Sequence, residues 1–100
     1  MKLKISPFAE EDLEESIEYY NIRKQGLGYE FARTVSDTFD RIKENPLQFP
    51  YEYKEMRKAQ IDKFPFNIYF VIKNPVGYIL GIFHSSRNPL KMRVRYKNFD

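Results

Sequence analysis

The sequence predicts an α+β domain in which a helical hairpin packs on one face of a small curved sheet. Two amphipathic patterns with helical spacing occupy residues 7–45. Two apolar runs rich in β-branched and aromatic residues follow, at Phe66 to Ile72 and Tyr78 to Phe83. The predicted order is an N-terminal strand, two helices and a three-stranded antiparallel meander, β-α-α-β-β-β, which forms two layers. A chain of 100 residues is expected to be a single domain spanning 1–100.

The composition excludes several kinds of functional site. The chain has no cysteine, which excludes disulfides and thiolate chemistry. Its single histidine, His84, has no cysteines or clustered acids nearby, so we expect no metal site and no cofactor. The sequence has no leader pattern and no apolar run long enough to span a bilayer, so we expect a cytoplasmic protein that does not contact the membrane.

Charge is distributed unevenly along the chain. Residues 1–55 carry 12 acidic and 8 basic side chains, whereas residues 56–100 carry 2 acidic and 9 basic side chains. A positive field over the second half favours nucleic acid or an acidic protein as a partner. The other interpretation is that these basic residues serve only to keep the protein soluble.

The first helix is predicted by its cap and by its apolar stripe. Lys2 to Ile5 alternates as a short strand, Ser6 can cap a helix, and Pro7 suits the first helical position. The acids of this segment, Asp12 among them, are expected to form a solvated face, and the helix is expected to end near Gly26. The stripe consists of Ala9, Leu13, Ile17 and Tyr20.

A second helix is predicted from Tyr29 to Glu44, after a tight corner at residues 26–28. Asn45-Pro46 should end it, because proline cannot continue a helix and also restrains the residue before it. Its apolar stripe consists of Phe31, Val35, Phe39 and Ile42, with Ala32 beside it.

The remaining segments complete the sheet. Leu47 to Tyr53 is interpreted as a loop or crossover, and Met56 to Ile61 as a strand leading into the hairpin. Lys73 to Gly77 contains Asn, Pro and Gly, which permit the chain to reverse. Residues 90–100 alternate basic with apolar side chains, which indicates either an edge strand or a tail that orders on a partner. The sheet face opposite the helices is then left for water or a ligand.

These elements resemble the RelE/ParE superfamily of toxins from type II toxin–antitoxin systems, with a closer likeness to the ParE branch and its neighbouring plasmid stabilisation proteins. The resemblance covers nearly the whole chain and rests on an ordered set of short motifs. They are Ala9-x-x-Asp12-Leu13 with Ile17 and Tyr20, Pro46 with Pro50, Arg57, Phe64-Pro65-Phe66-x-Ile68-x-Phe70, and His84-x-x-Arg87-x-Pro89.

The resemblance implies two alternative activities. RelE-like members are metal-independent endoribonucleases that cut mRNA on the ribosome, whereas ParE-like members are not enzymes and poison DNA gyrase. Both kinds are neutralised by a cognate antitoxin protein, through which alone they reach operator DNA. A non-toxic module that acts only as a co-repressor with its antitoxin is the third possibility.

Four residues are candidates for catalysis. Arg87 and Arg57, at positions matching the family's arginines, could clamp a phosphate, since a guanidinium is planar and always charged. His84 could exchange protons near neutral pH. Tyr96 could take the role of the C-terminal tyrosine that some RelE-like nucleases use. Each also has a structural interpretation: either arginine as a pairing residue, His84 as a hydrogen-bonded residue following the Tyr78, Leu80, Ile82 side of its strand, and Tyr96 as part of an edge strand.

Further basic residues are candidates for contacts with a nucleic acid or protein target. We expect them to join Arg57 and Arg87 in a cationic patch on the uncovered sheet face. The strand at Phe66 to Ile72 carries Asn67, Tyr69 and Val71 where RelE-like nucleases often have basic residues, which favours a target other than RNA, or a weak toxin. Glu52 and Glu55 are interpreted as surface acids. The candidate target-binding residues are Lys58, Lys63, Lys91, Arg93, Arg95 and Lys97.

Overall fold

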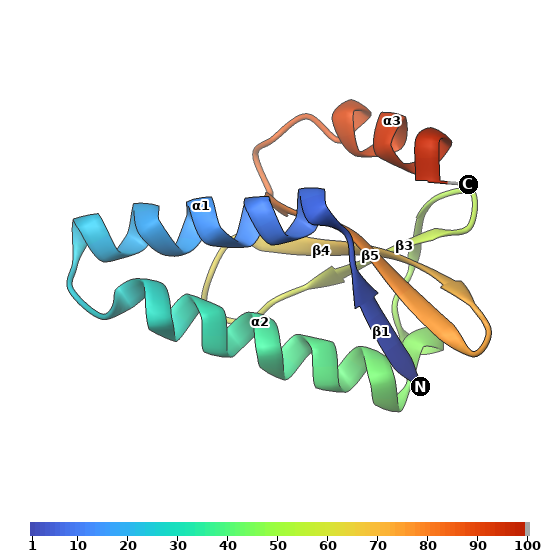
Figure 1. Ribbon diagram of the computed structural model, residues 1–100, viewed down its shortest axis with the longest axis horizontal. Helices are drawn as coiled ribbons and strands as arrows, with labels where there is room; N and C mark the ends of the chain where they lie inside the picture. The colour runs from blue at the N-terminus through green and yellow to red at the C-terminus, as the bar shows by residue number, and fades with distance from the viewer. Residues whose placement is uncertain (100) are drawn as a thin grey trace.

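The structure is a computed structural model that describes residues 1–99. Its sheet has the strand order β1-β5-β4-β3-β2, with a helical hairpin on one face and a C-terminal helix on the other (Figure 1). The elements in chain order are β1 (Lys2–Ile5), α1 (Pro7–Arg23), α2 (Leu27–Glu44), a 3-10 turn (Pro46–Gln48), β2 (Tyr51–Tyr53), β3 (Met56–Gln60), β4 (Phe66–Lys73), β5 (Val76–His84) and α3 (Leu90–Phe99).

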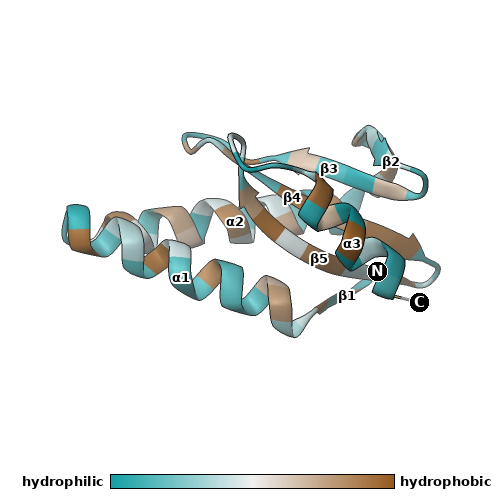
Figure 2. Ribbon diagram, turned by 90° about the horizontal axis from the view of Figure 1, so that it is seen from above, coloured by the Kyte–Doolittle hydropathy of each residue, from teal (hydrophilic) through white to brown (hydrophobic). Residues whose placement is uncertain are grey.

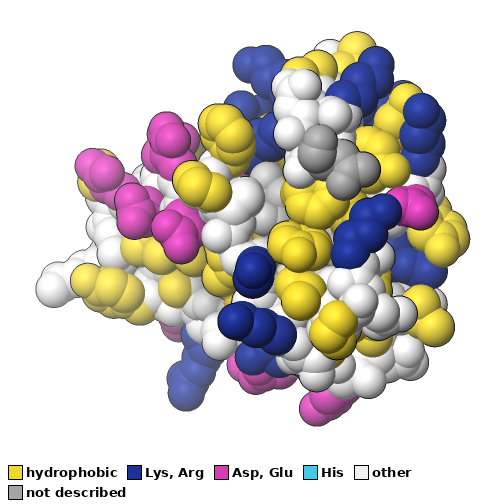
Figure 3. Space-filling view, turned by 45° about the vertical axis from the view of Figure 1, so that its right-hand side comes forward, with side chains coloured by type: hydrophobic (Ala, Val, Ile, Leu, Met, Phe, Trp, Pro, Cys, Tyr) yellow, Lys and Arg dark blue, Asp and Glu magenta, His cyan; other side chains and the backbone are white. Residues whose placement is uncertain are grey.

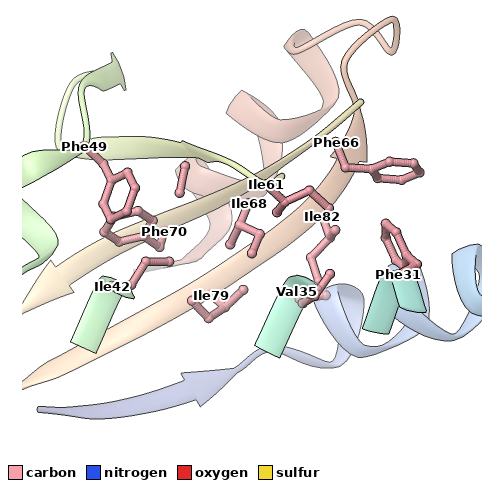
Figure 4. Packing of buried hydrophobic residues seen from close by; sticks show 12 residues of the cluster. Phe31, Val35, Ile42, Phe49, Ile61, Phe66, Ile68, Phe70, Ile79 and Ile82 are labelled. Carbon is pink, nitrogen blue, oxygen red and sulfur yellow. The ribbon is translucent and has the colours of Figure 1, made fainter. Parts of the chain in front are cut away.

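The predicted helical hairpin is confirmed, and both apolar stripes face the sheet. Phe31, Val35 and Ile42 of α2 are buried against β4 and β5 (Figure 4). Leu13 and Ile17 of α1 are half-buried at the rim of the same cluster. This packing buries the side of β4 and β5 that meets the helices.

Helix boundaries follow the expected local signals. The Ser6 side chain accepts a hydrogen bond from the Ala9 N–H at 3.1 Å, and Pro7 occupies the first turn. Helix α2 begins at Leu27 rather than Tyr29, so Gly28 belongs to the helix, where it is buried against α1. A Cβ at position 28 would collide with the backbone carbonyl of Ile17, so only glycine allows this approach.

The sheet contains the predicted meander of β3, β4 and β5, with β1 added in parallel beside β5. Strands β4 and β5 are almost wholly buried, since both faces of the sheet are covered along them (Figure 2). The interpretation of Leu47 to Tyr53 as a loop was wrong at its end, because Tyr51–Tyr53 pairs with β3.

Residues Leu90–Phe99 form a helix, so the prediction of an edge strand or unordered tail was wrong. Met92, Tyr96 and Phe99 recur at spacings of four and three and pack on the second sheet face, which is therefore not left open. The basic residues of this segment alternate in sequence, and this alternation was interpreted instead of the helical spacing of the apolar residues. The start signal was present in Asn88-Pro89, since the Asn88 side chain accepts a hydrogen bond from the Leu90 N–H at 3.0 Å.

Candidate functional site

The free edge of β5 is held by polar side chains from two helices, α1 and α3. Strand β1 ends at Ile5, and beyond that point Asp12 accepts a hydrogen bond from the Ile82 N–H at 2.9 Å. Arg95 of α3 pairs with both oxygens of the same carboxylate, at 2.6 and 3.1 Å, and donates to the Leu80 carbonyl at 3.2 Å. Asp12 is only 7% exposed, so its placement on the solvated acidic face was wrong. Arg95 joins the two helical layers across the sheet edge.

A β-bulge in β5 determines which way His84 points. The register shifts between Tyr69 and Phe70, so that Leu80 has no opposing residue on β4. His84 therefore does not follow the side of Tyr78 and Leu80, as the uninterrupted alternation predicted. It lies on the face of the helical hairpin, with its ring 5.2 Å from that of Phe66.

The ring nitrogens of His84 have distinct roles. The Ser86 N–H donates a hydrogen bond to Nδ1 at 3.0 Å, and the Ser86 hydroxyl lies 2.7 Å from the same nitrogen. Because Nδ1 accepts the backbone N–H, the neutral ring carries its proton on Nε2. In this arrangement Nδ1 is engaged by Ser86, and Nε2 is the nitrogen left to contact another group.

Arg87 is exposed in the turn that follows His84. Its backbone N–H donates a hydrogen bond to the His84 carbonyl at 2.9 Å, and its guanidinium lies 3.8 Å from the centre of the Phe83 ring. His84 and Arg87 line the same cleft beside α1, so the structure brings these two candidates together.

Arg57 lies in a different environment. It is opposite Phe70 on β4, which places it on the helical-hairpin face. Its guanidinium donates to the Phe49 carbonyl at 2.6 Å and lies 3.9 Å from the centre of the Tyr51 ring. These contacts engage the Arg57 side chain away from Arg87, which stacks on Phe83 and lines the cleft beside α1.

Tyr96 lies on the α3 face, at a third location. Its ring meets Tyr53 edge to face at 5.9 Å. It also lines a shallow cleft with Lys54, Lys73 and Lys97. The four candidate catalytic residues are thus distributed over three environments, and only His84 and Arg87 share one.

A polar cluster beneath α3 was not predicted. Glu52 is half-buried and forms a 3.5 Å ion pair with Arg93, whose guanidinium lies over the Tyr53 ring. Burial raises the pKa of Tyr69 above its ordinary value; nearby Glu52 adds to this, and a hydrogen bond with Asn67 opposes it. The sequence signal for this cluster was the presence of polar side chains within the apolar run of β4. Their partners lie on other elements, so the run alone did not identify them.

Tyr69 predicts how stability responds to alkaline pH. The folded state retains the Tyr69 proton to a higher pH than the unfolded state, whose tyrosines titrate at about pH 10. The part of the folding stability that depends on protonated Tyr69 is therefore fully present below that pH. It is lost as the pH rises through the pKa of Tyr69 in the folded state. We expect Tyr69→Phe to show a shallower fall in the free energy of unfolding above about pH 10, measured by urea denaturation across a pH series. An unchanged slope would contradict the assignment.

The remaining predicted target-binding residues do not form one patch. Lys91 and Lys97 are exposed on α3, and half-buried Lys58 is on β3. Lys63 lies in a loop beside α2, where it lines a separate cleft with Arg33 and Phe64. Figure 3 shows carboxylates gathered over the helical end of the molecule and Lys and Arg side chains over the α3 side.

Two other features are absent from the part of the chain that the structure describes. Among residues 1–99, no group of three or more His, Cys, Asp or Glu side chains is arranged to hold a metal ion. No helix in the same range combines the length and apolarity that crossing a bilayer requires.

Comparison with known proteins identifies the fold. No protein-family model matches the sequence, and no curated protein matches it either. Among solved structures, the chain is similar to a chain of the chromosomal ParDE TA system from P. aeruginosa, with a TM-score of 0.75 and 20% identity. The match covers 84% of this chain and 95% of that chain. The RelE/ParE-like fold predicted from the sequence is thereby confirmed.

Proposed function

We propose that this chain is the toxin of a type II toxin–antitoxin module and that it arrests growth by binding DNA gyrase, as ParE-like toxins do. A cognate antitoxin would neutralise it in the cytoplasm and would supply the contacts to operator DNA. Residues 1–100 would act as a single toxin domain without metal or cofactor. The likeness to a ParDE chain over most of both chains supports the toxin–antitoxin part of this proposal.

The separation of the candidate catalytic residues carries the choice of gyrase over RNA. Metal-independent RNA cleavage needs a base, an acid and a cation around one phosphate. Here Arg57 is engaged by Phe49 and Tyr51, Tyr96 packs on Tyr53, and His84 has its Nδ1 occupied. An arrangement of this kind suits binding of a protein target better than acid–base catalysis.

Growth assays with inducible expression test the proposal. We expect growth arrest, an induced DNA damage response and altered plasmid supercoiling, with transcripts intact. Co-expression of the antitoxin should restore growth. Transcripts cleaved within minutes of induction would instead indicate a RelE-like endoribonuclease, and neither effect would leave the non-toxic co-repressor.

Single charge changes on α3 should have modest effects if the target is bound through a diffuse positive field. Lys91 and Lys97 are exposed, so Lys91→Gln and Lys97→Gln are each expected to weaken gyrase binding by up to about fivefold. The loss should shrink as salt is raised, because salt screens exposed charges. Titration of the purified protein against gyrase at two salt concentrations measures this. Complete loss of binding on one such change would point to a localised site instead.

Arg87→Ala separates the two mechanisms further. A nuclease that clamps its phosphate with Arg87 would lose toxicity entirely while keeping its fold, since the side chain is exposed. Under the gyrase proposal, toxicity should fall only partly. Circular dichroism of the purified variant checks the fold in parallel with the growth assay.

A further inference from the structure

A cleft between α1 and the end of β5 has the features of a binding site. Its volume is about 450 Å³, within the range of roughly 300–1,000 Å³ typical of ligand clefts. Tyr19 and Arg23 of α1 line one side, and His84 and Arg87 line the other.

The floor of this cleft is apolar. Ile82 and Phe66 are buried, and Tyr20 packs edge to face on Phe66 at 6.0 Å and on Phe64 at 5.0 Å. Burial raises the pKa of Tyr20, so its hydroxyl stays neutral near physiological pH. Such a floor suits an aliphatic or aromatic side chain.

The rim carries hydrogen-bond donors held by aromatic rings. The Arg23 guanidinium lies 4.2 Å from the centre of the Tyr19 ring, and Arg87 lies on Phe83. Stacking on an aromatic face leaves the N–H groups at the guanidinium edge available to an acceptor. His84 adds its Nε2 to the same rim, since its Nδ1 is engaged by Ser86.

The charges lining the cleft leave one positive charge uncompensated. Asp12 also lines it, but Arg95 neutralises that carboxylate. Neither Arg23 nor Arg87 forms an ion pair within residues 1–99. With Glu15 as the other acid of the lining, two free guanidinium groups face one free carboxylate.

We propose that this cleft binds a segment of a partner polypeptide that inserts an apolar side chain and places one carboxylate between Arg23 and Arg87. This inference rests on the cleft and is independent of the toxic activity proposed above. Nucleic acid fits less well, because the exposed Glu15 in the lining would repel successive phosphates.

Nuclear magnetic resonance titration of the ¹⁵N-labelled full chain tests the proposal with three probes. Two are the capped dipeptides N-acetyl-Leu-Glu-amide and N-acetyl-Leu-Gln-amide, which differ only in charge. The third is a thymidine tetranucleotide. The Nε–H signals of Arg23 and Arg87 report occupancy of the rim, and backbone signals of Ile82 and Phe66 report occupancy of the floor.

We expect the Glu peptide to shift all four signals and to bind about three- to tenfold more tightly than the Gln peptide. The Arg23→Gln, Arg87→Gln double variant should bind both peptides equally. The double variant Arg33→Gln, Lys43→Gln removes the same charge from exposed positions of α2 and should retain the preference. Equal affinity of the wild type for both peptides, absence of shifts in the cleft, or tighter binding of the tetranucleotide would each overturn the proposal.

Discussion

Asp12→Ala should destabilise the protein by about 3–5 kcal/mol, because it breaks a buried ion pair and leaves one charge without a partner. The Arg95 side chain is 18% exposed and would remain against Phe83 without its carboxylate. The same substitution leaves the Ile82 N–H without its acceptor at the free edge of β5. Urea denaturation monitored by circular dichroism measures the loss.

Two further variants separate the ion pair from the cap on the sheet edge. Asp12→Asn keeps an oxygen for the Ile82 N–H but removes the charge. The double variant Asp12→Ala, Arg95→Met removes both charges and should be more stable than Asp12→Ala alone, since no buried charge remains unpaired. A double variant that is less stable than Asp12→Ala by the full cost of Arg95→Met would show that the two side chains act independently.

Phe31→Ala is expected to cost about 3–5 kcal/mol, the range for removing a large aromatic side chain from a packed core. Phe31 is fully buried, and its ring meets those of Tyr20, Phe64 and Phe66 at 5.4, 5.3 and 4.7 Å. These rings join α1, α2 and the start of β4, so the cavity would open where the three elements meet. Since small domains are stable by only about 5–15 kcal/mol, the loss is a large fraction of the total.

Tyr29→Ala provides the matched control for Phe31→Ala. Tyr29 is an aromatic residue on the same helix, but it is 71% exposed. Its removal should change the free energy of unfolding by no more than about 0.5 kcal/mol. If the two substitutions had equal effects, the burial of the α2 stripe against the sheet would be wrong.

Much of the fold could be predicted because the signals for it are local. The stripes of α1 and α2, the Ser6-Pro7 start and the turn at Lys73–Gly77 each depend on neighbouring residues. The prediction failed at α3, where a spacing of two among the basic residues competes with a spacing of three to four among Met92, Tyr96 and Phe99. Short segments of this kind fit either period, and only the apolar face beneath α3 selects the helix.

The candidate site could be predicted less well. Residue types picked out Arg57, His84 and Arg87, but they carry no information on which sheet face each residue occupies. The bulge at Leu80 reverses the direction of His84, and a bulge depends on pairing with β4 rather than on the sequence of β5. The role of Asp12 was hidden because its partner is 83 positions away.

The helical hairpin, the β3–β5 meander and the apolar stripes of α1 and α2 therefore follow from this sequence alone, because hydrophobic spacing records them within a few residues. Tertiary structure decided that Asp12 and Arg95 are buried together, that Arg57 and Arg87 lie in separate environments, and that His84 and Arg87 line a cleft with α1. These outcomes depend on strand register and on contacts between distant segments. A charged side chain has the same local pattern whether it meets water, an opposite charge or an aromatic ring, so only the packed chain distinguishes them.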